Sequence, residues 1–408
     1  MRALAALSAV LGASAAAQTA ELADVDQVRA IVAEAMHDAT TRTSLAMETA
    51  GHDGRFFIES VDGDYRLAIH GFTQFRYTGN WADAPPGANE FTGGFSIVRS
   101  RLFFDGKLPE NLTYRVRLGF SSSSGNATLE QAYFNVPLPD QWSLRAGQFA
   151  LALFRDDWIE AARQLAVNSS AVNTLFGPGQ SQGLMASRVW DEVRMWGAFT
   201  NGLRTENTPF NGNVADAALT ARIEWKPVGA WSQFDNYSSP RGADFALMLG
   251  LAAHWETQRP LLANLVTDQL LYATGDISLE GDGWNFFAAG VYTYREGHLP
   301  GSTQEIEPQN AGVIIQGGLF VTDHIELFAR GDYTWGEGNA EAPSDIATYT
   351  AGFNYYFFPG SQALKFSFDV LYAPFSVNGT SLQNNNAVGL VTSDGEQWVL
   401  QAQLQVMY

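Results

Sequence analysis

Basic side chains recur at even spacings within successive segments of the first 150 residues, and a short acidic run follows them. The basic set is Arg66, Arg76, Arg99, Arg101, Lys107, Arg115, Arg117 and Arg145. The acidic set is Asp156, Asp157 and Glu160. Arginine carries a planar fork of donors that suits carboxylate and phosphate groups. On one face of a sheet, the basic set would form a basic wall that attracts oxyanions, faced by a loop of opposite charge. The alternative is that these arginines only pair with nearby acids and hold the wall together.

Patterns for catalysis or metal binding are missing from the sequence. The chain has no cysteine and six histidines, and we find no nucleophile elbow, zinc-protease motif or phosphate-cradling glycine loop. We therefore expect no catalytic residue, no metal site and no cofactor. The net charge of −19 argues against a nucleic-acid partner, because duplex binding requires clustered cations.

The kind of element that would position such a wall is visible in the last segment of the chain, where apolar residues alternate with mostly polar ones. Its apolar face carries Trp398, Leu400, Ala402, Leu404, Val406 and Tyr408. Its polar face carries Gln397, Gln401, Gln403 and Gln405. A period of two indicates a β-strand with a different medium on each face.

Similar segments recur from residue 65 onward, separated by turn-rich stretches, and we count about sixteen of them, each about ten residues long. No uncharged apolar run after the N-terminus approaches the roughly 18 residues of a spanning helix. Aromatic residues gather at segment ends, and short turns alternate with long polar loops. The sequence thus predicts an all-β fold, a transmembrane antiparallel β-barrel with a short N-terminal helix, embedded in outer-membrane lipid. A barrel of this size leaves an aqueous channel.

The N-terminus carries an export signal. Arg2 precedes an apolar stretch, and small residues end in Ala15-Ala16-Ala17, a pattern that a signal peptidase cleaves. We predict a cleaved signal peptide at residues 1–17 rather than an uncleaved anchor, for which the stretch is too short. Residues 18–50 contain an amphipathic helix that would lie in the periplasm, either as a coiled-coil arm or as a solvated tail. The barrel would follow at residues 51–408.

The chain resembles the phosphate-selective porin O and P family. The resemblance rests on four segments of this sequence, namely FFIESVDGDYRLAIHGFTQFRY, VRSRLFFDGKLPENLTYRVRLGF, LEQAYFNVPLPDQWSLRAGQFALALFRDD and RQLAVNSSAVNTLF, and on the terminal aromatic strand. It implies a sixteen-stranded homotrimeric porin with basic residues along an anion path. It also implies an extracellular loop folded into the lumen, here near residues 150–181. The three lysines of this chain are a departure from the lysine-rich vestibules of the phosphate-selective members.

The function we predict is passive diffusion of small hydrophilic solutes and ions across the outer membrane, with oxyanions such as phosphate among them. Several carboxylates also fall on inward positions of later strands: Asp216, Glu224, Asp244, Asp276, Glu326, Asp332 and Asp369. A lumen that is basic on one half and acidic on the other favours a general or weakly selective pore.

Two alternatives compete with that prediction. A sugar-specific porin would need an aromatic slide, which Phe72, Phe103 and Trp158 could begin. More simply, these aromatics would pack the inward loop against the wall. An outer-membrane barrel hydrolase would need a reactive histidine, and only His70 and His254 fall on inward strand positions.

Overall fold

The computed structural model describes residues 30, 32–34, 36, 50–87, 89–262, 265–336 and 345–408. Two compact units divide the chain, Met1–Gly51 and His52–Tyr408. In the first unit, residues 30, 32–34 and 36 are helical. The predicted signal peptide and the rest of the predicted helix lie outside the described residues. Among the helices that the structure describes, none is long and apolar enough to span a membrane.

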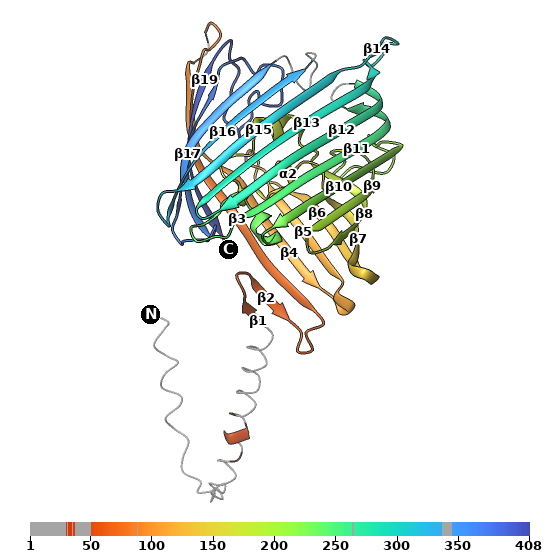
Figure 1. Cartoon of the computed structure of the whole chain (residues 1–408), viewed down its shortest axis with the longest axis vertical. Coiled ribbons are helices and arrows are strands. Elements are labelled where there is room, and N and C mark those ends of the chain that lie inside the picture. Colours follow the sequence, from red (N-terminus) through yellow and green to blue (C-terminus); the bar gives the residue numbers. More distant parts are fainter. Residues whose placement is uncertain are drawn as a thin grey trace, which may run out of the picture. The chain divides into compact units, whose positions relative to one another are not determined.

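In the described part of the second unit, sixteen antiparallel strands form one closed wall (Figure 1). They are β3 (Arg66–Ala82), β4 (Phe91–Lys107), β5 (Thr113–Phe120), β6 (Ala127–Pro137), β7 (Trp142–Ala150), β8 (Gln180–Val189), β9 (Val193–Thr200), β10 (Ala217–Val228), β11 (Ala246–Leu262), β12 (Leu265–Gly281), β13 (Trp284–His298), β15 (Gln309–Phe320), β16 (Ile325–Gly336), β17 (Ile346–Tyr356), β18 (Leu364–Ala373) and β19 (Gln397–Met407). Each pairs with the next, and β19 pairs with β3 to close the barrel. The short strands are β1 (Ala50–His52), β2 (Phe56–Glu59) and β14 (Glu305–Ile306). The predicted fold class and strand number are confirmed.

The two faces of the wall differ as the alternation predicts. In β19, Gln397 and Gln405 are fully buried inside the barrel, whereas Trp398 and Val406 expose 48% and 42% of their surface on the outside. An outward apolar face with a polar interior is the arrangement of a barrel in lipid. The same parity turns the basic residues of β3, β4, β5 and β7 toward the lumen.

At the seam between β3 and β19, the backbone of Gly71 pairs with that of Tyr408. The Gly71 and Tyr408 amides donate to each other's carbonyl oxygens at 2.6 and 2.9 Å. A Cβ on Gly71 would lie 2.5 Å from the Arg101 carbonyl oxygen and 2.9 Å from the Tyr408 ring. Glycine is therefore required at this close approach.

Two hairpins extend farther than the sequence predicts. The predicted strands end at Tyr77 and begin at Phe95, but β3 runs to Ala82 and β4 starts at Phe91. Gly79 pairs with Gly93 in this extension, so the ladder continues through positions that have no side chain to reveal it. The next such pair is extended in the same way: the strands predicted to end at Trp255 and to begin at Gln269 are β11, which runs to Leu262, and β12, which starts at Leu265.

A long connection between β7 and β8, which we call the inserted loop (residues 151–179), runs through the lumen. It contains α2 (Arg155–Trp158), η3 (Ala161–Arg163) and α3 (Ala171–Phe176). Several contacts attach it to the opposite wall. Among them, the Val167 amide donates to Asp369 Oδ2 at 3.0 Å, Arg330 Nη1 donates to the Asn168 carbonyl at 2.7 Å, and Tyr272 Oη donates to the Phe176 carbonyl at 2.8 Å. The loop is thus held against β12, β16 and β18.

A second connection enters the lumen from the other end of the barrel. This lower loop (residues 229–245) joins β10 to β11 at the end where the short turns η1 (Pro109–Asn111) and η2 (Pro139–Gln141) lie, and it contains η4 (Trp231–Asp235). Phe234 and Tyr237 expose only 1% and 3% of their surface. Tyr237 Oη donates to Asp156 Oδ1 at 3.2 Å, so the lower loop meets the inserted loop inside the barrel. It is an exception to the short turns predicted at this end.

Candidate functional site: an arginine-lined cavity

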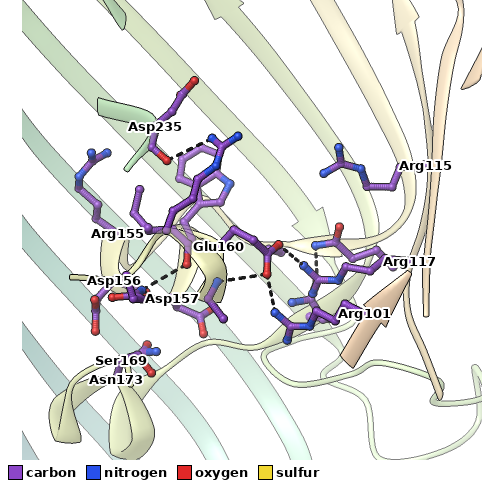
Figure 2. Close-up of a pocket in the computed structure, with 18 of the residues that line it drawn as sticks. Arg101, Arg115, Arg117, Arg155, Asp156, Asp157, Glu160, Ser169, Asn173 and Asp235 are labelled. Atoms are coloured by element: carbon purple, nitrogen blue, oxygen red, sulfur yellow. Dashed lines mark hydrogen bonds and ion pairs between the residues drawn. The ribbon is translucent and has the colours of Figure 1, made fainter. Parts of the chain in front are cut away.

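A cavity of about 490 Å³ remains between the inserted loop and the wall formed by β4 to β9 (Figure 2). We call it the arginine cavity. Its basic lining is Arg99, Arg101, Arg115, Arg117, Arg145, Arg155, Arg163 and Arg194. Its acidic lining is Asp156, Asp157, Glu160 and Asp235. Arginines thus outnumber carboxylates by two to one among the lining residues.

The inserted loop is tied to the basic wall by one carboxylate. Arg101 Nη1 donates to Glu160 Oε1 at 2.5 Å, and Arg117 Nη1 donates to Glu160 Oε2 at 3.1 Å (Figure 2). Burial raises the pKa of Glu160, but the charges of Arg101 and Arg117 more than offset that and bring it down to about 2. Glu160 is therefore ionised at any physiological pH, and the loop of opposite charge faces the wall at this point.

A fourth member of this cluster, Glu130, was missed by the sequence reasoning. Its Oε2 lies 2.7 Å from Arg101 Nε and 2.8 Å from Arg117 Nε. Strict alternation along β6 turns Gln131 and Tyr133 inward and would turn Glu130 toward lipid. The pairing of β5 with β6 shifts register here, because Arg117 pairs with Gln131 and Leu118 with Leu129. The bulge redirects the Glu130 carboxylate into the lumen.

The remaining cavity arginines of the basic wall differ in their pairing. Arg115 is bound by Asp105 through two bonds of 2.6 and 2.8 Å. Arg99 donates only to the amide oxygens of Gln74 and Asn168, at 3.3 and 3.4 Å. Arg145 Nε donates to Asn135 Oδ1 at 2.8 Å. Within the described structure, neither Arg99 nor Arg145 forms an ion pair.

Three predicted members of the basic wall lie outside the arginine cavity. Arg76 is fully buried and donates to Gln403, Asn168 and the Ala387 carbonyl. Arg66 pairs with Asp53 and Glu59 at 2.5 and 3.4 Å. Lys107 contacts the Gly63 carbonyl at 3.5 Å. For Arg66 and Arg76 the contacts are those of structural residues.

The acids of the inserted loop also divide into two roles. Asp156 is 1% exposed and accepts from the Ser170 amide at 3.0 Å and from Tyr237, so it holds the two loops together. Asp157 faces the cavity, and its Oδ2 is buried without a hydrogen-bond partner in the described structure. Burial raises the pKa of Asp157 to about 6, against the opposing charge of Arg204. Asp157 is the cavity carboxylate that can lose its charge near neutral pH.

We predict that the ion preference of the pore depends on pH through Asp157. As the pH falls through about 6, Asp157 binds a proton and the cavity loses one negative charge. The anion-to-cation permeability ratio, measured from reversal potentials in planar bilayers, should therefore rise. Asp157→Asn should hold the high ratio at all pH values. An unchanged pH dependence in that variant would contradict the assignment to Asp157.

The inward carboxylates of the later strands do not face the cavity. Glu224, Asp276, Glu326, Asp332 and Asp369 are each 8% exposed or less. Arg222 lies between Glu224 and Asp276 at 2.7 and 2.8 Å. The expected acidic half of the lumen is instead filled by the inserted and lower loops. Asp216 and Asp244 are exposed, but they lie beyond the ends of β10 and β11.

The residues proposed for the two alternative functions are mostly packed away. Phe72 and Phe103 are 1% and 4% exposed and pack with Ala162 of the inserted loop, which is the packing role considered for them. His254 is 1% exposed and lies between Thr220 Oγ1 at 2.8 Å and Glu256 Oε2 at 3.2 Å. His70 Nε2 lies 2.9 Å from Asp105. No described group of three or more histidines and carboxylates could hold a metal ion.

Comparisons with solved structures agree with this architecture. The fold is similar to that of an anion-selective porin from Comamonas acidovorans, at a TM-score of 0.56. The two sequences are 11% identical, and the match covers 84% of this chain and 100% of that chain. A loop L8 deletion mutant of OmpT, an outer membrane protein of Vibrio cholerae, matches with 13% identity over 85% of this chain and 100% of that chain, at a TM-score of 0.53. OprB of Pseudomonas putida in its high-pH structure matches with 8% identity over 84% and 94%, at 0.52. No curated protein sequence matches the chain.

The closed sixteen-stranded wall and its inserted loop give this chain a fold similar to that of the solved porin. At the level of sequence, the family described as phosphate-selective porin O and P matches residues 73–165. That match runs from within β3 through β7 to the first part of the inserted loop, and it confirms the predicted resemblance over these residues.

Proposed function

We propose that this chain forms a water-filled pore through which small hydrophilic anions diffuse passively across the outer membrane. The observation that carries the proposal is the arginine cavity, whose lining holds twice as many arginines as carboxylates. Fixed cations in a narrow, low-dielectric passage raise the local concentration of anions and exclude cations. Because the later carboxylates are buried, the proposed pore prefers anions more strongly than an evenly divided lumen would.

The chemistry of the cavity supports oxyanions, including phosphate, as the preferred solutes. Guanidinium groups bind such oxygens through paired donors. Arg99 and Arg145 have no carboxylate partner in the described structure and are available to a passing anion. We propose no catalytic step for this pore. Hydrolysis of lipid or peptide by the purified protein, lost in His70→Ala, would contradict that part of the proposal.

Export and assembly are part of the same proposal. Residues 1–17 would direct export and be removed by signal peptidase, which N-terminal sequencing of the mature protein tests. The family resemblance supports a homotrimer, and cross-linking of the detergent-solubilised protein tests the number of copies. Residues 18–50 would then remain on the periplasmic side.

We predict that Arg99→Ala combined with Arg145→Ala lowers the anion-to-cation permeability ratio severalfold. Each substitution removes a cavity cation that forms no ion pair among the described residues. Reversal potentials under a KCl gradient measure the ratio. The matched control is Arg66→Ala with Lys107→Ala, which removes two cations of the basic wall outside the cavity and should leave the ratio nearly unchanged. Equal permeability ratios in the wild type and the cavity variant would contradict the proposal.

A further inference from the structure

Aromatic side chains share the arginine cavity with the cations. Tyr133, Trp158, Trp196 and Phe234 all line it. Trp158 of α2 and Trp196 of β9 meet edge to face, with ring centroids 4.8 Å apart and planes at 75°. Both rings are only partly buried, so each still presents surface to the cavity. The conduction of inorganic anions does not require this surface.

Two of the cavity cations stack on aromatic rings. The Arg145 guanidinium lies 4.1 Å above the centre of the Tyr133 ring. Arg194 lies 4.3 Å from the Trp231 ring centre and 5.3 Å from that of Trp196. Such stacking holds a guanidinium plane while leaving its outer nitrogens able to donate.

The Arg145 guanidinium uses only one of its nitrogens in a described hydrogen bond. Its Nε donates to Asn135, and its two terminal nitrogens reach no acceptor in the part of the chain that the structure describes. Arg194, by contrast, is paired with Glu224. Arg145 is therefore the cation of this aromatic side that is open to a bidentate anion.

Resting on the proposed anion pore, we infer that the arginine cavity contains a binding subsite for planar organic anions of the aromatic carboxylate class. The carboxylate binds the terminal nitrogens of Arg145, and the ring packs against the exposed surface of Trp158 and Trp196. Carboxylates match the guanidinium fork, and aromatic rings gain from offset or edge-to-face contact. The cavity volume of about 490 Å³ falls within the roughly 300–1,000 Å³ of small-molecule sites.

Other solute classes use only part of this lining. An inorganic oxyanion occupies the arginines and leaves the tryptophan surface in contact with water. A neutral sugar stacks on the aromatics but leaves the Arg145 donors without an anion. Only a molecule with both a charged planar group and a ring satisfies both halves of the subsite.

The test is block of chloride current through the wild-type pore in planar bilayers. Benzoate is the probe, cyclohexanecarboxylate is the matched anion without a π-system, and acetate is the anion without a ring. We expect benzoate to block at a concentration about fivefold lower than cyclohexanecarboxylate, since aromatic pairs contribute beyond their area. Trp196→Leu should remove that difference and leave block by acetate unchanged. Trp335→Leu, at an outward-facing position of β16, should leave all three values unchanged.

Arg145→Gln supplies the second arm. It should weaken block by benzoate and by cyclohexanecarboxylate equally, about tenfold, because it removes a charge-assisted bond that both share. If the Trp196→Leu variant does not insert into the bilayer, block of the Trp196→Phe variant and of the wild type by the same three anions tests the subsite. Equal block by benzoate and cyclohexanecarboxylate in a pore that still prefers chloride over potassium overturns the subsite alone. A wild-type pore that does not prefer chloride over potassium overturns the proposed function instead.

Discussion

Replacing Glu160 with alanine is expected to raise the anion-to-cation permeability ratio about fivefold. The change corresponds to about 1 kcal/mol, the interaction of two unit charges about 4 Å apart in water. In the wild type, Glu160 and Glu130 together neutralise Arg101 and Arg117. Without Glu160, one guanidinium charge in the arginine cavity is left for solution anions. Reversal potentials and single-channel conductance measure the outcome.

Glu130→Ala is the matched variant, because it removes the same charge from the same two arginines. Glu130 belongs to the wall, whereas Glu160 belongs to the inserted loop, so only Glu160→Ala also removes the ion pairs that tie the loop to β4 and β5. Both variants should therefore raise the ratio, but only Glu160→Ala should make the loop more sensitive to protease. Glu160→Asp, which keeps the charge, should change little. A ratio that falls in either alanine variant would show that anions do not use these arginines.

The second large effect is expected from shortening the lower loop. Replacing Trp231–Tyr237 by a two-residue turn should raise single-channel conductance about twofold, because a sixteen-stranded barrel without packed segments encloses an open aqueous channel. This segment is the part of the lower loop that reaches the inserted loop, through the Phe234 carbonyl to Arg155 at 2.5 Å and through Tyr237 to Asp156. Conductance in symmetric KCl is the measurement.

Tyr237→Phe separates the hydrogen bond from the bulk of the loop. It keeps the ring, which packs on Phe287 at 4.8 Å, and loses only the bond to Asp156. Conductance should then stay near the wild-type value while current noise rises as the two loops loosen. If the shortened variant conducts like the wild type, the lower loop does not obstruct the path of the ions.

Much of the barrel followed from alternation alone. The inward positions of Arg99, Arg101, Arg115 and Arg117 could be read from the sequence because each lies in a segment with a period of two. Glu130 could not, since a bulge reverses parity at a position that only the pairing of β5 with β6 reveals. The strand extension through Gly79 and Gly93 was missed because glycine carries no side-chain pattern.

The electrostatic character of the lumen was harder to predict than its wall. Alternation shows that Glu224, Asp276 and Asp332 point inward, but it does not show what lies in front of them. The inserted and lower loops depend on contacts between residues far apart in sequence, such as Val167 with Asp369. Those contacts cover the later carboxylates and leave the early arginines as the lining of the cavity.

The seam between β3 and β19 sets the order in which this barrel can be completed. Gln74 bonds to Gln405 at 2.8 Å across a separation of 331 residues, and Tyr408 packs on Gly71. Neither of these strands has its partner across the seam until both β3 and β19 have formed. Pairing over such separations is slow and leaves strand edges open to aggregation. These two strand edges therefore stay unpaired until β3 and β19 meet and close the wall.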